Sequence, residues 1–339
     1  MSSQVSLQDT HTPLLLRRGD ESAAVLDIQQ RLTSAGYDTG TERGTFGEAT
    51  ETAVRAFQTE RGIAIDGICG PDTWEELTRA GYQLGDRNLY MRSPMMTGDD
   101  VLTLQEHLGK LGFNPIYHDG IFGERTHKAL QDFQRDSGID ADGVAGYATV
   151  EALVNLSRDL DTDSRSVAEM LEAEKLRNQP PEVRGRKIVV GITGASQVIS
   201  QALARHLREA GAEVLQHATI DAGQQAHLSN EWDSDAYIGI AIVSEDFSIS
   251  YYKTAGFESV GGKALADHCV TALKDLTDQG QLSSFPEPKG MRLSILRSTR
   301  MPAVWCRLGP PEEVVTRSSE IAEALSVGVV TWCANPVPT

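Results

Sequence analysis

The chain has 339 residues, enough for two or three domains of ordinary size. Apolar residues make up 40% of it and charged residues 23%, which is normal for a globular protein and excludes wholesale disorder. Its formal net charge of −17 makes nucleic acid and anionic membrane surfaces poor partners, because like charges repel.

The amino-terminal segment carries no targeting signal. It begins at Met1 and lacks both the basic start and the apolar run of a secretory signal, since Leu14-Leu15-Leu16 is too short for such a run. No stretch approaches the roughly 20 apolar residues of a membrane span. We therefore expect a cytoplasmic protein without membrane insertion, in which residues 1–13 form a flexible N-terminus.

The sequence contains an internal repeat. Two segments superimpose without a gap when one is shifted by 76 residues. The matching pairs include Val25 and Val101, Gln29 and Gln105, Leu32 and Leu108, Gly36 and Gly112, Phe46 and Phe122, Thr50 and Thr126, Phe57 and Phe133, Gln58 and Gln134, and Thr73 and Thr149. Apolar residues at helical spacing and glycines at the expected helix ends predict two three-helix units, over residues 14–82 and 90–157.

The repeated pattern resembles the peptidoglycan-binding-like three-helix domain. The order Asp-Gly, Phe-Gly, Thr, Ala-[Val/Leu], Phe-Gln, Gly-Ile, Asp-Gly, Gly, Thr runs from Asp119 to Leu153, and from Gly44 to Leu77 in the first copy. In the first copy Arg43 replaces the leading aspartate. Most of these residues are turn glycines and core residues, so the pattern indicates the fold and leaves open whether the ligand is glycan or protein.

The remainder of the chain predicts a linker and an α/β domain. Residues 158–184 are charged and end in Pro180-Pro181, which indicates a linker that includes a short amphipathic helix. From 185 to 333 strand and helix patterns alternate, which predicts a layered α/β domain, and residues 334–339 form a tail. The expected strands are residues 187–192, 213–215, 237–243, 292–296 and 303–306.

A cofactor site is weighed at the first strand. The segment VVGITGAS could be a phosphate-binding turn, and it locally resembles the flavin-binding turn of flavin prenyltransferases. It is not G-x-G-x-x-G, and no acidic residue stands at the distance needed to hold a ribose. We expect a structural turn and no cofactor.

The whole arrangement resembles that of actinobacterial CwlM-type proteins, which are similar to zinc-dependent N-acetylmuramoyl-L-alanine amidases. Residues Leu296 to Val304 match the family segment Leu-x-x-[Ser/Thr]-x-x-Pro-[Ala/Thr]-Val, which precedes the strand carrying the catalytic glutamate. The resemblance implies two all-α peptidoglycan-binding-like domains followed by an amidase-like α/β domain.

The resemblance also implies where zinc chemistry would occur, and those positions carry unsuitable residues. Gly194 and Ala241 stand in place of the two histidines, and Arg307 stands in place of the glutamate base. No acidic residue lies between Thr193 and Leu207 to supply the helix glutamate. Because a zinc hydrolase needs three ligands and a base, we expect no metal, no catalytic residue and a pseudo-enzyme. Arg307 is either solvated or carboxylate-paired, or it binds the carboxylate of a muropeptide.

Other chemistries find no support in the sequence. The histidines of the α/β domain form no HxxH, HxxxH or HExxH motif; they are His206, His217, His227 and His268. There is no G-x-S-x-G motif. The four cysteines are scattered, which predicts reduced and mostly buried thiols; they are Cys69, Cys269, Cys306 and Cys333.

The resemblance finally implies a function. CwlM-type proteins regulate peptidoglycan precursor synthesis, so we expect this chain to bind and activate MurA, the UDP-N-acetylglucosamine enolpyruvyl transferase. Mycobacterial members are switched by threonine phosphorylation in a C-terminal tail, of which only residues 334–339 remain here, so Thr10 and Thr12 become the candidate sites. A serine/threonine kinase and a forkhead-associated protein are then further partners. The alternatives are an N-acetylmuramoyl-L-alanine amidase acting on peptidoglycan fragments, and a module that binds muropeptide or a peptidoglycan precursor.

Overall fold

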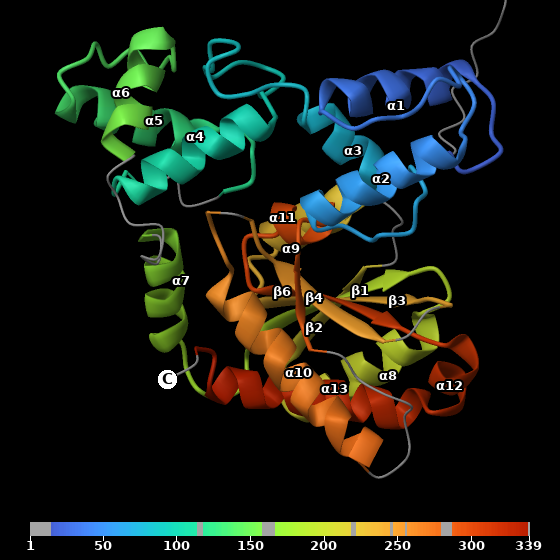
Figure 1. Ribbon diagram of the computed structural model, residues 1–339. Helices are drawn as coiled ribbons and strands as arrows, with labels where there is room; N and C mark the ends of the chain where they lie inside the picture. The colour runs from blue at the N-terminus through green and yellow to red at the C-terminus, as the bar shows by residue number, and fades with distance from the viewer. Residues whose placement is uncertain are drawn as a thin grey trace, which may run out of the picture. The chain divides into compact units, whose positions relative to one another are not determined.

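A computed structural model describes residues 15–113, 118–157, 167–217, 222–244, 247–254, 256–278 and 287–337 (Figure 1). The chain divides into two compact units, Met1–Tyr82 and Gln83–Thr339. The first unit holds the first repeat. The second holds the second repeat and the α/β domain. Thr10 and Thr12, the two candidate phosphorylation sites, lie outside the described residues.

Each repeat is a three-helix unit, as predicted. The first contains α1 (Ala23–Ser34), α2 (Glu48–Arg61) and α3 (Pro71–Arg79), and the second contains α4 (Asp99–Lys110), α5 (Glu124–Asp136) and α6 (Tyr147–Ser157). The cores are built from the matched apolar residues, among them Leu32 and Phe57 in the first repeat and Leu108 and Phe133 in the second.

A buried glutamine organises each Asp-Gly turn of the repeats. In the first repeat, Gln58 Nε2 donates to Asp66 Oδ1 at 2.8 Å, to the Ile68 carbonyl at 2.9 Å and to Thr73 Oγ1 at 3.0 Å. Its Oε1 accepts from the Gly67 amide at 2.9 Å. The pattern of Gln, Asp-Gly and Thr is therefore a hydrogen-bonded cluster that joins a helix to the turn after it.

The same cluster recurs at Gln105 and Gln134, whose Nε2 atoms donate to Asp119 and Asp142 at 2.9 Å. The fourth cluster is centred on Gln29 in the first repeat. There Arg43 replaces the aspartate, and Gln29 Nε2 donates instead to the backbone carbonyl of Glu42 at 2.8 Å. The departure at residue 43 thus removes one carboxylate acceptor without dismantling the turn.

The α/β domain is preceded by helix α7 (Val167–Arg177), which lies within the expected linker. Glu172 on α7 accepts hydrogen bonds from Ser259 Oγ at 2.8 Å, from the Val260 amide at 2.9 Å and from the Gly261 amide at 3.3 Å. These donors stand at the start of α10 (Val260–Asp278), where helix amides lack partners inside the helix. Helix α7 therefore supplies the cap of α10.

The α/β domain is built on a six-stranded sheet with strand order β2-β1-β3-β6-β4-β5. The strands are β1 (Lys187–Thr193), β2 (Glu213–His217), β3 (Ala236–Ile242), β4 (Ser248–Tyr252), β5 (Lys289–Met291) and β6 (Ala303–Leu308). Strand β4 runs antiparallel to β6, and the other neighbouring pairs are parallel. The helices are α8 (Gln197–Glu209), α9 (Ala222–Glu231), α10, α11 (Ser294–Ser298), α12 (Pro311–Thr316) and α13 (Ser318–Ala334).

One expected strand is wrong. Residues 292–296 were predicted as a strand, whereas the short strand β5 ends at Met291 and Ser294–Ser298 form helix α11. Ile295 and Leu296 are both buried on this single helical turn. Adjacent buried apolar residues are compatible with either state, so a short apolar run does not distinguish a buried strand from a buried helical turn.

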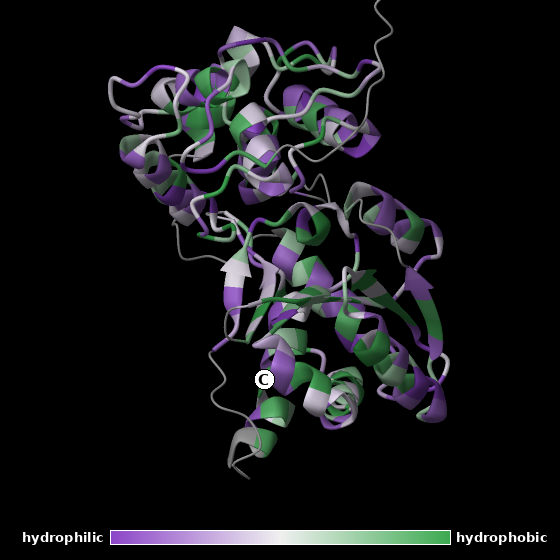
Figure 2. Ribbon diagram, turned by 90° about the vertical axis from the view of Figure 1, so that its right-hand side faces the viewer, coloured by the Kyte–Doolittle hydropathy of each residue, from purple (hydrophilic) through white to green (hydrophobic). Residues whose placement is uncertain are grey.

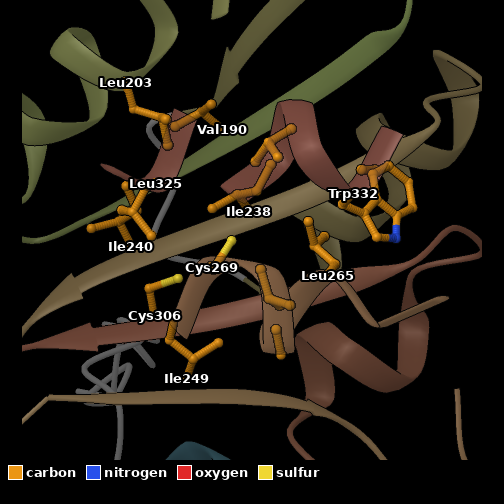
Figure 3. Packing of buried hydrophobic residues seen from close by; sticks show 14 of the residues in the cluster. Val190, Leu203, Ile238, Ile240, Ile249, Leu265, Cys269, Cys306, Leu325 and Trp332 are labelled. Atoms are coloured by element: carbon orange, nitrogen blue, oxygen red, sulfur yellow. The ribbon is translucent and has the colours of Figure 1, made fainter. Parts of the chain in front are cut away.

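The main core lies between one face of the sheet and helices α8, α10 and α13 (Figures 1 and 3). Alternate strand residues point into it, including Val190, Ile238, Ile240 and Ile249, and Trp332 of α13 is its largest fully buried side chain. Figure 2 shows hydrophobic residues concentrated on the central strands, with hydrophilic residues alternating along the helices. The four cysteines are free and buried, as predicted.

Candidate functional site

The positions implied by the amidase resemblance come together at one edge of the sheet. Thr193 on β1 pairs in register with Ala241 on β3, and Ala241 pairs with Arg307 on β6. Arg307 pairs in turn with Ser248 on the antiparallel strand β4. Gly194 follows Thr193 directly. Because neighbouring strands lie about 4.8 Å apart, Thr193, Ala241, Arg307 and Ser248 form one row along the carboxyl edge of β1, β3 and β6, and Gly194 adjoins it, which makes five residues in all. We call them the edge row.

The edge row offers no set of zinc ligands. Ala241 and Gly194 have no donor atom, and a guanidinium does not ligate zinc and repels a cation. Gly194 also has φ +60°, in the left-handed region, so a histidine at this place in the turn would be strained. Among the described residues, no three His, Cys, Asp or Glu side chains converge anywhere. The residues at this edge therefore do not fit the zinc that the family resemblance implies.

The turn after β1 uses its serine for structure. Ser196 is fully buried, its Oγ donates to the Ile240 carbonyl at 2.8 Å, and the Thr193 amide donates to that same Oγ at 3.1 Å. The hydroxyl thus joins the turn to β3.

The four histidines of the domain lie on different elements. His206 on α8 lies 3.7 Å from Glu209, and His227 on α9 lies 3.4 Å from Glu231. His268 on α10 lies with its Nε2 3.1 Å from the Asn335 carbonyl, at the end of α13. His217 ends β2, where burial lowers its pKa. The structure does not bring these side chains together.

Cys306 is placed for packing. Its side chain points into the main core beside Cys269 (Figure 3), and burial raises its pKa well above the usual value. Only the thiolate is an effective nucleophile, so this environment suppresses its reactivity.

Two aromatic side chains occupy the sheet face opposite the main core. Tyr237 lies over Gly191, where an added Cβ would stand 2.1 Å from the tyrosine oxygen, and its hydroxyl donates to Gln225 Oε1 at 2.5 Å. Trp305 lies over Gly239, where an added Cβ would stand 2.2 Å from the indole ring. The strand glycines Gly191 and Gly239 were an available signal of such close approach, and sequence reasoning missed it.

A cavity that the sequence did not predict lies at the opposite edge of the sheet from the edge row. Its volume is about 500 Å³, and it is bounded by α7, by the segments entering β3 and β6, by α11 and by the second repeat. The polar side chains lining it include His118, Arg125, Glu172, Lys175, Asn230, Asp233, Asp235, Arg297 and Arg300. Because the lining comes from five separate stretches of chain, no local motif marks it.

His118 joins the second repeat to the α/β domain at this cavity. Its carbonyl accepts a hydrogen bond from Tyr252 Oη at 2.7 Å, and its ring contacts Phe257 edge-on at 5.2 Å between centroids. Neither ring nitrogen has a hydrogen-bond partner, and burial lowers the pKa of His118 to about 4.

The fold defines the class of protein: two small helical repeats followed by an α/β domain with a mixed six-stranded sheet. Residues 21–77 and 97–153 match the family model described as a putative peptidoglycan binding domain. The chain is 32% identical to N-acetylmuramoyl-L-alanine amidase CwlM of Mycobacterium tuberculosis, over 93% of this chain and 87% of that protein. The chain therefore belongs to the CwlM family of amidase-related proteins.

Further comparisons cover parts of the chain. N-acetylmuramoyl-L-alanine amidase CwlL of Bacillus licheniformis is 32% identical over 41% of this chain and 45% of its own length. A crystal structure of N-acetylmuramoyl-L-alanine amidase from Clostridium difficile 630 aligns with 44% of this chain and 97% of its own, with 16% identity and a TM-score of 0.39. Within the described residues, none of the helices combines the length and apolar character that crossing a membrane would need.

Proposed function

We propose that this protein is a non-catalytic regulator of peptidoglycan precursor synthesis, which acts in the cytoplasm by binding and activating a MurA-type enolpyruvyl transferase. The observation that carries the loss of catalysis is the edge row. Ala241 and Arg307 are paired in register and Gly194 follows Thr193, the partner of Ala241, and none of the three can hold zinc or act as the base. The choice of partner rests on the resemblance to CwlM-type proteins.

Activation of an enzyme requires differential binding. The regulator must bind the active conformation of the transferase more tightly than the inactive one, and the ratio of the two affinities sets the largest possible activation. Such a role needs a folded surface and no reactive group. It is therefore compatible with an α/β domain whose carboxyl edge has lost its ligands.

The decisive experiment measures transferase turnover. Purified full-length protein is titrated into the MurA-type enzyme of the same organism, and phosphate release from phosphoenolpyruvate is followed with UDP-N-acetylglucosamine present. We expect the rate to rise and to saturate as the complex fills. An unchanged rate over a large molar excess of the protein would reject the activator role.

The family resemblance favours one alternative, an active N-acetylmuramoyl-L-alanine amidase. It requires stoichiometric zinc and release of alanine-linked peptides from muropeptides. We expect neither on incubation of the full chain with zinc and purified muropeptide. Peptide release that depends on added zinc would overturn the pseudo-enzyme assignment and would show that ligands come from positions outside the edge row.

Arg307 supplies the edge row with its only charge. If the domain holds a muropeptide, a guanidinium at this position would bind a peptide carboxylate through paired hydrogen bonds. Arg307→Gln should then weaken muropeptide binding roughly tenfold, the loss of one charge-assisted hydrogen bond. Arg205→Gln, on the exposed part of α8, is the matched control. Equal affinities for both variants would place the muropeptide elsewhere.

Thr10 and Thr12 belong to the proposal as phosphorylation sites for a serine/threonine kinase. The expected readout is loss of kinase-dependent MurA activation, and of binding to a forkhead-associated protein, in the double variant Thr10→Ala, Thr12→Ala. Mass spectrometry of the phosphorylated full chain that locates phosphate on other residues would reject these two positions.

A further inference from the structure

The second repeat uses one face to hold the α/β domain. On this face Glu106 Oε1 accepts a hydrogen bond from Thr254 Oγ1 at 2.8 Å, and the His118 carbonyl accepts one from Tyr252 Oη at 2.7 Å. The segment after β4 packs closely there, because a Cβ added to Gly256 would stand 2.8 Å from Glu106 Cδ. This face of the second repeat is therefore a protein–protein interface within one chain.

The hydrogen bonds across this interface share a direction. In both of those just described, the repeat supplies the acceptor and the α/β domain supplies the donor. A third bond follows the same rule, since Asp99 at the start of α4 accepts from Arg292 Nη2 at 3.1 Å. An acceptor-bearing helical face thus pairs with hydroxyl and guanidinium donors.

The corresponding face of the first repeat is open. Three positions can be compared under the offset of 76 residues: Gln30 with Glu106, Thr33 with Gly109, and Glu42 with His118. All three are exposed in the first repeat, whereas in the second repeat the residue at 106 is half-buried and those at 109 and 118 are buried. Gln30 and Thr33 line a groove of about 420 Å³ together with Leu26, Asp38 and Arg43. We call it the first-repeat groove.

The groove keeps the acceptor character of the covered face. Gln30 provides an amide oxygen at the position equivalent to Glu106, and its side chain makes no hydrogen bond with another described residue. Asp38 and Glu42 add carboxylates in and beside the groove, and Arg43 adds one guanidinium. Acidic residues also outnumber basic ones in the whole unit Met1–Tyr82. Such a surface favours a partner that presents hydroxyl and cationic donors.

We propose that the first-repeat groove is the docking site for a protein partner, which inserts an exposed loop with hydroxyl and cationic side chains, as Tyr252 and Thr254 contact the second repeat. The proposal rests on the proposed function, so the partner is the MurA-type transferase. The second repeat offers no second copy of this site, because the α/β domain covers its equivalent face.

The test measures binding of the transferase to the full chain by calorimetry, with two double variants of equal added charge. Gln30→Lys, Thr33→Lys removes the amide acceptor and places two cations in the groove, so the affinity should fall roughly tenfold or more. Thr52→Lys, Thr59→Lys on α2 lies outside the groove and should leave the affinity unchanged. The exchanged threonines are matched, since each is exposed and donates its hydroxyl to the carbonyl four residues earlier at 2.7 to 2.9 Å. Equal thermal unfolding of the two variants verifies that both fold.

The outcomes separate this docking site from the proposed function. Equal transferase affinity in the two double variants would overturn the docking site and leave the proposed function intact. A wild-type chain that does not bind the transferase would reject both. Muropeptide is the competing occupant: if Gln30→Lys, Thr33→Lys loses muropeptide binding but retains the transferase, the groove holds glycan and the protein docking site is rejected.

Discussion

The glutamine clusters of the repeats permit a sharp test of how the Asp-Gly turns are held. Gln134→Leu removes four hydrogen bonds, three donated by Nε2 to Asp142, Val144 and Thr149 at 2.9 to 3.2 Å, and one accepted from the Gly143 amide at 2.8 Å. Leucine fills a similar volume and leaves those turn groups buried without the glutamine. At about 1 kcal/mol net for each bond, partly offset by the apolar side chain, the loss is about 3 kcal/mol.

Hydrogen exchange measured by mass spectrometry on the full chain reports this loss locally, because it follows the opening of single regions. Peptides covering α5 and the turn after it should open roughly a hundredfold more often in Gln134→Leu than in wild type. Gln131→Leu is the matched control on the same helix, since that half-buried glutamine makes one long bond of 3.4 Å to the Ala141 carbonyl. Similar exchange in both variants would refute the idea that the buried glutamine holds the turn.

Three further expectations follow from other contacts. Arg43→Asp should stabilise the first repeat by about 1 kcal/mol in urea unfolding, because it restores the missing acceptor beside Gln29; an unchanged midpoint would contradict this. Glu172→Ala should lower the free energy of unfolding by about 2 kcal/mol and speed amide exchange at the start of α10. Glu174→Ala, on the exposed side of α7, should change neither quantity. Burial lowers the pKa of His118 from 6.5 to about 4, so the unfolded chain takes up a proton at a higher pH than the folded chain does. The free energy of unfolding should therefore fall by up to about 3 kcal/mol between pH 6.5 and 4. The variant His118→Asn should flatten that pH dependence in urea titrations.

The sequence was most informative where its pattern was repeated or buried. The offset of 76 residues predicted both helical units, because matched core residues and turn glycines reveal periodicity without any alignment. Strands β1, β3 and β6 were predicted because central parallel strands are buried on both faces and read as continuous apolar runs. Strand β4 was missed, because it spans only five residues and its two serines leave it without a continuous apolar run. Residues 292–296 were wrongly predicted as a strand, because a short buried apolar run fits a strand and a helical turn equally well.

The two candidate sites differ in what sequence could predict. The edge row was identified through family motifs, and the strand register then aligned Ala241 with Arg307. The cavity had no such signal. Arg125 and Arg300 are far apart along the chain, and each alone is an ordinary exposed arginine. Only the packing of the second repeat and α7 against the α/β domain places them around one volume.

The edge row and the main core are physically separate. The core lies between one face of the sheet and α8, α10 and α13, and none of Gly194, Ala241 and Arg307 belongs to it. Substitution at those positions therefore removes no core packing and creates no core cavity, the two largest sources of destabilisation. On the opposite face, Tyr237 and Trp305 fill the space above Gly191 and Gly239. The residues of the edge row can therefore vary without loss of the core that holds the domain together.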